Sequence, residues 1–326
     1  MRRLPLLLAL VTLAGCVAAP APPTSPLLLP TRVLREPTLA PTPDARTYYE
    51  AGLACQSAGD SECALQSLTQ AIQIDPGFAP AYVARGAVYL ALGELDEALS
   101  DADAALEIDP VNASAYALRG ELLRLLDQPR PALEDFDRAV SYDLTLEEAL
   151  FRSRWLAALA AEDADRLVKL SRDYADAHPE DPLRYYYRGW AFVERGNPEI
   201  AIDLLIYGIQ ETPAPPALLW FALGYAYLEG DFWQEAVTSL EVARGLVEAG
   251  DASLGFHSDR PTADLFGALG RAYLGAGRCA DAQAMLEYAI AVGASPADYG
   301  TALTDARRCQ TPTPAPTPEA TTTPLP

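Results

Sequence analysis

The stretch "WFALGYAYLEGDFWQEA", residues 220–236, places two small residues on opposite sides of a turn. Gly224 lies in its first apolar run and Ala236 lies in its second, with the polar segment "EGDF" between them. Apolar residues recur at helical spacing on both sides of this segment, which predicts two antiparallel helices joined by a short turn. A glycine that faces an alanine across the pair allows the two helices to approach closely.

The same pairing of small residues recurs along the chain. Each of six glycines precedes an alanine by twelve residues, and the first three glycines are 34 residues apart. The six are Gly52, Gly86, Gly120, Gly189, Gly224 and Gly270. Arg154 stands where the period places a further glycine. A non-repeating helical bundle would not keep this phase through three units, so the sequence predicts a repeat architecture.

A period of this length, with glycine, alanine and large aromatic residues in fixed columns, resembles the tetratricopeptide repeat. Copies of the motif read "WFALGYAY" at 220–227, "YVARGAVY" at 82–89, "YYYRGWAF" at 185–192 and "FGALGRAY" at 266–273. The resemblance covers residues 45 to about 295. It implies an all-α fold, a right-handed α-solenoid of about seven helix hairpins.

Three segments depart from the regular repeat. The fourth unit, about 147–181, has Arg154 in place of glycine, which leaves its register open. The segment "AGDASLGFHSDRP", residues 249–261, is interpreted as an insertion between the sixth and seventh units. A final helix at "PADYGTALTDARRC", residues 296–309, is expected to cap the open end of the last hairpin, because a solenoid needs a terminal cap.

The first sixteen residues have the pattern of an export leader. "MRR" is positively charged, and the apolar run "LPLLLALVTLAG", residues 4–15, is too short for a helix that spans a bilayer about 30 Å thick. The segment "LAGC" that ends at Cys16 resembles the lipobox of bacterial lipoproteins, whose cysteine carries a diacylglycerol. The resemblance implies a lipidated Cys16 on an extracytoplasmic protein anchored to the cell membrane. An ordinary secretory leader with a chance cysteine is the alternative.

Composition divides the chain into four parts. We expect a signal peptide at 1–15, a Pro/Thr-rich tether at 16–44, the solenoid with its capping helix at 45–309 and a disordered Thr/Pro-rich tail at 310–326. The net charge of −21 lacks the basic footprint of a nucleic-acid-binding protein. Anionic headgroups would repel such an acidic body, so membrane contact is expected through the N-terminal lipid alone.

The other four cysteines form two pairs. Cys55 and Cys63 lie at equal distances from the turn of the first predicted hairpin, and Cys279 and Cys309 flank the last predicted turn in the same way. Antiparallel helices bring such positions together, and disulfides are common in exported proteins. We therefore predict one disulfide at each end of the solenoid. Metal binding is the alternative, although neither pair is a C-x-x-C motif and no histidine stands nearby.

No catalytic motif is present in the sequence. His178 and His257, the two histidines, lie outside any recognised motif, and neither a nucleophile elbow nor a glycine-rich phosphate loop occurs. The carboxylates of Asp101, Asp103 and Glu107 are interpreted as a solvated helix face. We therefore expect no enzyme activity, no cofactor and no metal site.

The resemblance implies that the first helix of each unit lines a concave groove. The candidate partner-binding residues are Tyr49, Phe151, Trp155, Tyr186, Trp190, Phe221, Tyr225 and Arg271. We define Tyr186, Trp190, Phe221 and Tyr225 as the aromatic patch and expect its rings to be partly exposed on the concave side. The alternative is that several of these rings pack between units. The lysine and asparagine that clamp a terminal carboxylate in some repeat proteins are missing from these positions.

Two functions remain open on this basis. The resemblance implies a scaffold that binds an unidentified protein or extended peptide during assembly of an envelope complex. The alternative is a module that binds glycan or cell wall through the aromatic patch.

Overall fold

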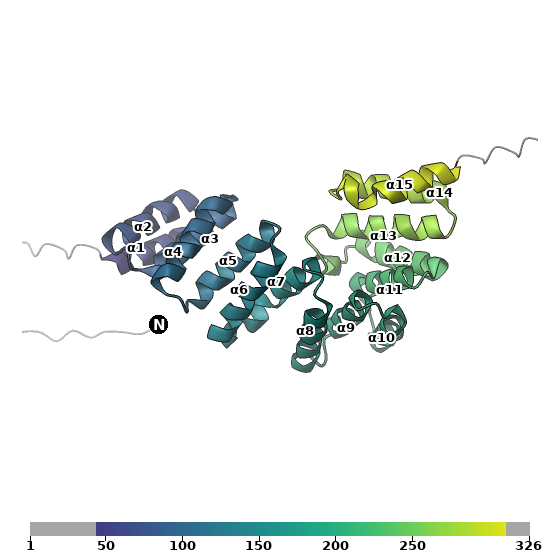
Figure 1. Ribbon diagram of the computed structural model, residues 1–326, viewed down its shortest axis with the longest axis horizontal. Coiled ribbons are helices and arrows are strands. Elements are labelled where there is room, and N and C mark those ends of the chain that lie inside the picture. Colours follow the sequence, from purple (N-terminus) through teal and green to yellow (C-terminus); the bar gives the residue numbers. More distant parts are fainter. Residues whose placement is uncertain (1–43, 311–326) are drawn as a thin grey trace, which may run out of the picture. The chain divides into compact units, whose positions relative to one another are not determined.

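The computed structural model describes residues 44–310, and this part holds fifteen α-helices, two short 3-10 helices and no strand. Consecutive helices pack as antiparallel hairpins along the chain (Figure 1). The hairpins are α1 (Ala45–Ser57) with α2 (Ser61–Ile74), α3 (Ala79–Leu92) with α4 (Leu95–Ile108), α5 (Ala113–Leu125) with α6 (Pro129–Tyr142), α7 (Glu147–Ala160) with α8 (Ala164–Ala177), α9 (Leu183–Glu194) with α10 (Pro198–Glu211), α11 (Ala217–Glu229) with α12 (Trp233–Glu248) and α13 (Pro261–Gly275) with α14 (Cys279–Ala291).

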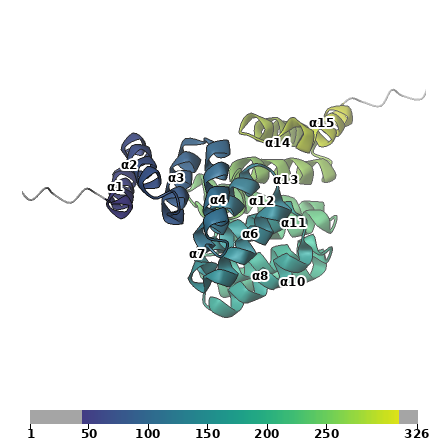
Figure 2. The ribbon, with the colours of Figure 1, turned by 60° about the vertical axis from the view of Figure 1, so that its left-hand side comes forward.

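Two further features complete this part of the chain. The helix α15 (Pro296–Gln310) packs on α14 and α13, where a capping helix is expected (Figure 2). The 3-10 helices are η1 (Leu144–Leu146) before α7 and η2 (Ser253–Phe256) inside the predicted insertion. The fold is thus the all-α solenoid of seven hairpins and a capping helix that the sequence predicts.

In six of the seven hairpins a glycine of the first helix lies against a side chain of the second. A Cβ atom added at Gly86 would lie 3.2 Å from the carbonyl oxygen of Ala98, the alanine twelve residues later. At Gly224 an added Cβ would lie 2.5 Å from Cγ of Leu240, a distance that no ordinary packing allows. Glycine is therefore required by the interhelical contact itself, which confirms the predicted role of the small residues.

The fourth unit follows the period despite its arginine. Helices α7 and α8 occupy 147–177, close to the expected range. Arg154 is buried and its guanidinium lies 3.0 Å from the Asp137 carboxylate of α6, with Glu147 at 3.8 Å. The buried arginine side chain is thus paired with the preceding unit.

The predicted solvated face is wrong for Asp101. This carboxylate is buried and accepts hydrogen bonds from Arg85 at 2.8 and 2.7 Å. Arg119 and Asp135 repeat the same pair one unit later, at 2.7 and 3.1 Å. A buried carboxylate needs such a partner, because an unpaired charge in the interior is costly.

Several sequence-based expectations concern other parts of the chain. The signal peptide, Cys16, the tether and the tail lie outside the described residues, except for Asp44 and Gln310 at the edges. Within 44–310, no helix combines the length and apolar character needed to span a membrane.

Candidate functional site

The insertion at 249–261 is anchored at its base to the start of α11. The Asp251 carboxylate accepts a hydrogen bond from the backbone N–H of Ala217 at 2.8 Å, and the Ser253 hydroxyl accepts one from Leu218 at 3.1 Å. Pro216 precedes α11 and its side chain cannot cap the helix, so the insertion supplies the acceptors for these free N–H groups. The base of the insertion therefore acts as the N-terminal cap of α11.

Beyond this base, His257 enters the predicted groove. Its side chain is buried, and its ring centroid lies 4.4 Å from that of Trp190, 4.8 Å from that of Phe221 and 6.3 Å from that of Tyr186. The Tyr186 hydroxyl and Nδ1 of His257 lie 2.9 Å apart, which is hydrogen-bond distance. The imidazole thus fills the space between the rings of α9 and α11.

Burial keeps this imidazole neutral. It lowers the pKa of His257 to about 3, because the charged form would lose its hydration. Asp264 of α13 faces the other ring nitrogen, with Oδ2 at 4.0 Å from Nε2. Burial also raises the pKa of Asp264, although the hydroxyl of Ser258 donates a hydrogen bond to its carboxylate. With its proton on Nε2, the neutral ring accepts a hydrogen bond from the Tyr186 hydroxyl at Nδ1, while Asp264 stays beyond hydrogen-bond distance of Nε2.

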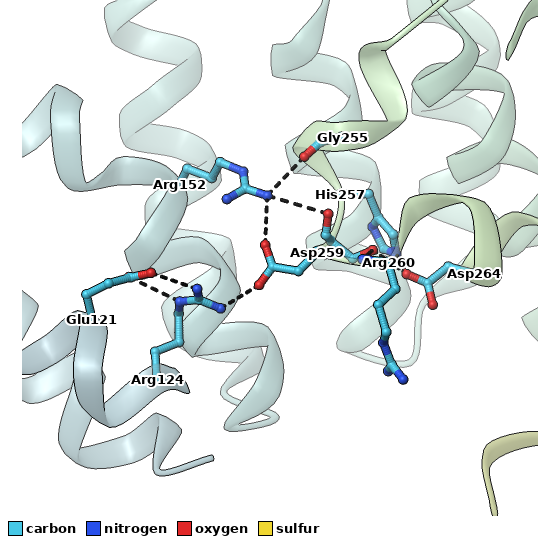
Figure 3. A network of polar contacts seen from close by, with 9 residues as sticks. Glu121, Arg124, Arg152, Gly255, His257, Asp259, Arg260 and Asp264 are labelled. Atoms are coloured by element: carbon cyan, nitrogen blue, oxygen red, sulfur yellow. Dashed lines mark hydrogen bonds and ion pairs between the residues drawn. The ribbon is translucent and has the colours of Figure 1, made fainter. Parts of the chain in front are cut away.

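Asp259, two residues after His257, joins the insertion to two earlier units (Figure 3). Its carboxylate accepts hydrogen bonds from Arg124 of α5 at 2.7 Å and from Arg152 of α7 at 3.2 Å. Arg152 also donates to the backbone carbonyl of Gly255 at 3.0 Å. Burial alone would raise the pKa of Asp259, but the two guanidinium groups lower it on balance. We call Arg124 and Arg152 the arginine clamp.

The insertion explains why the aromatic patch is covered. The exposed fractions of Tyr186, Trp190 and Phe221 are 0%, 3% and 1%. The expectation of partly exposed rings is therefore wrong for these three. His257 covers them from the groove side, and Trp190 also packs on Phe221 with ring centroids 5.8 Å apart.

Tyr225, the fourth member of the aromatic patch, is half-buried. Its ring centroid lies 4.7 Å from that of Trp190, and Arg271 donates a hydrogen bond to its hydroxyl at 3.4 Å. Arg271 is paired in turn with Glu229 at 3.0 Å. These two predicted groove residues are adjacent and keep some solvent access.

The other predicted groove residues divide into two groups. Phe151 and Trp155 are buried, and the ring of Tyr187 lies 4.8 Å from each of theirs, so they extend the aromatic cluster into the fourth unit. Tyr49 is half-buried and packs edge-on against Phe78 in the first two units, beside a cavity of about 300 Å³. The structure thus brings seven of the eight candidates into one region and leaves Tyr49 apart.

Sequence reasoning missed the residues that hold the insertion. His257 and Asp259 belong to a segment recognised only as an insertion, and the arginine clamp belongs to no motif. The one available signal was the content of the insertion itself, "FHSDR", which is rich in groups that make directional contacts.

The structure joins both predicted cysteine pairs as disulfides. The Cα atoms of Cys55 and Cys63 are 5.7 Å apart, and those of Cys279 and Cys309 are 5.9 Å apart. Both separations suit a disulfide without backbone movement. Among residues 44–310, no group of three or more His, Cys, Asp or Glu side chains is placed to hold a metal ion.

Comparison with known proteins supports the resemblance to the tetratricopeptide repeat. The family model of the tetratricopeptide repeat matches residues 57–122. A tetratricopeptide repeat protein from Parabacteroides merdae has a similar structure, with a TM-score of 0.64 and 18% identity over 81% of this chain and 98% of that one.

A second similar structure belongs to the APC/C hetero-tetramer Cut9–Hcn1, with a TM-score of 0.52 and 15% identity. That match covers 80% of this chain and 49% of the other. A search of the curated proteins finds no match by sequence. At these identities the likeness concerns the fold, and the helix hairpins, the glycine columns and the matched repeats agree with it. The chain is an α-solenoid of helix hairpins similar to tetratricopeptide repeats, and residues 57–122 match the family model of that repeat.

Proposed function

We propose that this protein is a membrane-anchored scaffold that binds a protein or an extended peptide in its concave groove. The observation that supports this function is that the groove already holds a stretch of polypeptide. The insertion lies against α5, α7, α9 and α11 through a buried ring, an ion-paired carboxylate and a backbone carbonyl. These are the groups through which any peptide segment can be recognised.

The fold is compatible with this role. Tetratricopeptide arrays stack short repeats into extended binding surfaces. One structure of similar fold is a hetero-tetramer assembly, the APC/C pair Cut9–Hcn1. For this chain we propose a partner within an envelope complex. We propose no glycan-binding role, because the insertion covers the three rings that would stack on a sugar.

The anchoring half of the proposal depends on the leader. Arg2, Arg3 and the apolar run before Cys16 suit export, and the "LAGC" segment suits lipidation at the cysteine. The two cysteine pairs suit an oxidising compartment. We therefore propose a location outside the cytoplasm, with the lipid as the contact with the bacterial cell membrane.

Site-specific crosslinking in cells tests the binding half. A photoreactive amino acid replaces Tyr225, which is half-buried beside Trp190. It should crosslink to a single partner protein, recovered in a one-to-one ratio with this protein. The same group at Tyr142, an exposed residue of α6, serves as the control and should not give that product. Identical products from both positions, or retention on purified cell wall without a protein partner, would contradict the proposal.

The substitution Cys16→Ser tests the anchoring half. The variant should leave the membrane fraction or retain its leader. Intact-mass measurement of the wild-type protein should show acyl chains on an N-terminal Cys16. A mature terminus elsewhere without acyl chains would refute lipidation and leave the binding proposal standing.

A further inference from the structure

The tip of the insertion, residues 256–260, differs from its base in the way it is held. The base is fixed by helix-capping hydrogen bonds and by the buried side chain of Leu254. The tip reaches α5, α7, α9 and α11 through the buried imidazole of His257 and the half-exposed carboxylate of Asp259. On its other side the Ser258 hydroxyl donates to Asp264, and Arg260 contacts the Gly293 carbonyl and Asp298. Phe256 at the start of the tip is exposed to solvent.

We propose that this tip is an exchangeable ligand of the groove, and that a partner peptide displaces it. The partner segment would carry an uncharged aromatic or imidazole ring followed two residues later by a carboxylate. This inference rests on the proposed scaffold function and names the chemistry of the partner. The groove between α5 and α11 is then a peptide site that the protein occupies itself when the partner is absent.

Arg124, one of the two arginines of the clamp, is oriented by a residue outside the tip. Two nitrogens of Arg124 donate to the carboxylate of Glu121 at 2.7 and 3.1 Å, which leaves its Nη1 directed at Asp259 (Figure 3). The hydrogen bonds to Glu121 raise the pKa of Arg124 and outweigh burial, which lowers it, and Asp259 adds a smaller rise. The guanidinium therefore keeps its charge and orientation when the carboxylate leaves, and a second carboxylate can bind in the same place.

The ring subsite has supports of its own as well. Nε1 of Trp190 donates to Glu194 at 3.0 Å, and the ring of Trp190 packs against Phe221 and Tyr225. None of these contacts involves the tip. If His257 withdraws, an apolar slot remains with the Tyr186 hydroxyl at one side as a hydrogen-bonding group. Such a slot suits a flat ring that accepts a hydrogen bond.

Two glycines precede the tip and give the backbone on that side freedom to move, while Arg260 at its other end caps α13. Gly250 has a φ of +102°, in the region that favours glycine, and a side chain at Gly255 would meet no neighbouring atom. The ion pairs of Asp259 lie at the surface, where salt and water weaken them. The short connection to the base still holds the tip at a high effective concentration, so a partner must bind well to displace it.

Charge restricts the partner further. The protein carries a net charge of −21, so a strongly acidic partner would be repelled at long range. The arginine clamp offers a local site for one carboxylate. The expected partner segment therefore has a single acidic residue after its ring and a neutral or basic sequence around it.

A peptide with the tip sequence tests the exchange directly. The probe is fluorescent "LGFHSDR", residues 254–260, added to the wild-type protein and to the double variant His257→Ala/Asp259→Ala. We expect the double variant to bind it at least about tenfold more tightly, because its own tip no longer competes. The control peptide "LGFASAR" should not bind. Adding Arg124→Ala and Arg152→Ala to the double variant should remove binding of the probe.

Hydrogen exchange on the wild-type protein gives a second measurement that needs no variant. If the tip opens alone, the amide of His257, which donates to Leu254 at 2.9 Å, should exchange at least about a hundredfold faster than the core amides of α11. Exchange of this amide only through global unfolding would overturn the inference, even if the double variant fails to fold. Equal binding of the probe to a folded double variant and the wild type would also overturn it. If the probe, added before irradiation, does not reduce the yield of the protein crosslinked at Tyr225, the scaffold function stands and this inference alone is refuted.

Discussion

Asp259 accepts a hydrogen bond at 2.7 Å from Arg124, a residue 135 positions earlier in the chain. In a regular solenoid each repeat contacts only its neighbours. This contact instead joins the insertion after the sixth hairpin to the third hairpin. The insertion therefore links units that the repeat alone would leave unconnected, and it does so inside the groove where a partner is expected.

The burial of Trp190 predicts a large effect on stability. Trp190→Ala should lower the free energy of unfolding by about 3–5 kcal/mol, since the ring packs on Phe221, Tyr225 and His257. Urea denaturation measures this loss. The matched control is Tyr142→Ala at a half-exposed position, for which we expect a loss below about 1 kcal/mol. A loss of less than about 1 kcal/mol for Trp190→Ala would contradict the burial of this ring and support an exposed binding residue instead.

The glycine columns predict opposite results for two glycines of the sixth hairpin. Gly224→Ala should lower the free energy of unfolding by about 1–3 kcal/mol, because the new Cβ would meet Leu240 at 2.5 Å. Gly245→Ala, in the last turn of α12 with open space around it, should raise the free energy of unfolding by up to about 1 kcal/mol. Thermal or urea melts of the two variants compare them directly. Equal effects would show that the close approach of α11 and α12 does not require glycine.

The cysteine pairs remain a prediction about oxidation state. Alkylation of the exported protein without reductant should label none of Cys55, Cys63, Cys279 and Cys309, and peptide mapping should recover the two linked pairs. Each disulfide closes a short loop, so its reduction should cost about 2–3 kcal/mol of stability. Complete labelling of all four cysteines would show that they are free thiols.

Stability should fall in acid because of His257. Its pKa is about 3 in the folded protein and about 6.5 in an unfolded chain, so the unfolded chain binds the proton first as the pH falls. The contribution of the neutral ring is complete above pH ~6.5 and is lost progressively toward pH ~3. Between pH 7 and pH 5 the loss should be about 2 kcal/mol.

The control for this prediction must separate His257 from its neighbours. Asp264 faces the ring from α13 with a pKa raised by burial, so its contribution has the opposite sign and is lost as the pH rises. Burial raises the pKa of Tyr186, which faces the ring from α9, well above the acid range. The difference between the stability curves of the wild type and His257→Gln, repeated in an Asp264→Asn background, isolates the imidazole. Parallel curves for the wild type and His257→Gln would refute its burial.

The sequence predicted the hairpins well because the information for them is local. Gly86 and Ala98 lie twelve residues apart, and the period repeats their geometry in each unit. The position of the insertion inside the groove could not be predicted from such local information. His257 meets Tyr186 across 71 residues, and a periodic pattern shows which face a side chain is on without showing what covers that face. The sequence therefore places the aromatic patch on the helices that carry it, but the expected partial exposure is wrong for Tyr186, Trp190 and Phe221.

The protonation of His257 tests most directly whether the insertion fills the groove. The chain has two histidines, so a ¹⁵N-labelled His178→Gln protein leaves a single imidazole to follow by NMR. If the ring lies between Trp190 and Phe221, it should stay neutral from pH 7 down to pH 5 while the protein remains folded. Titration with a midpoint near the ordinary value of about 6.5 would place the ring in water and contradict the filled groove.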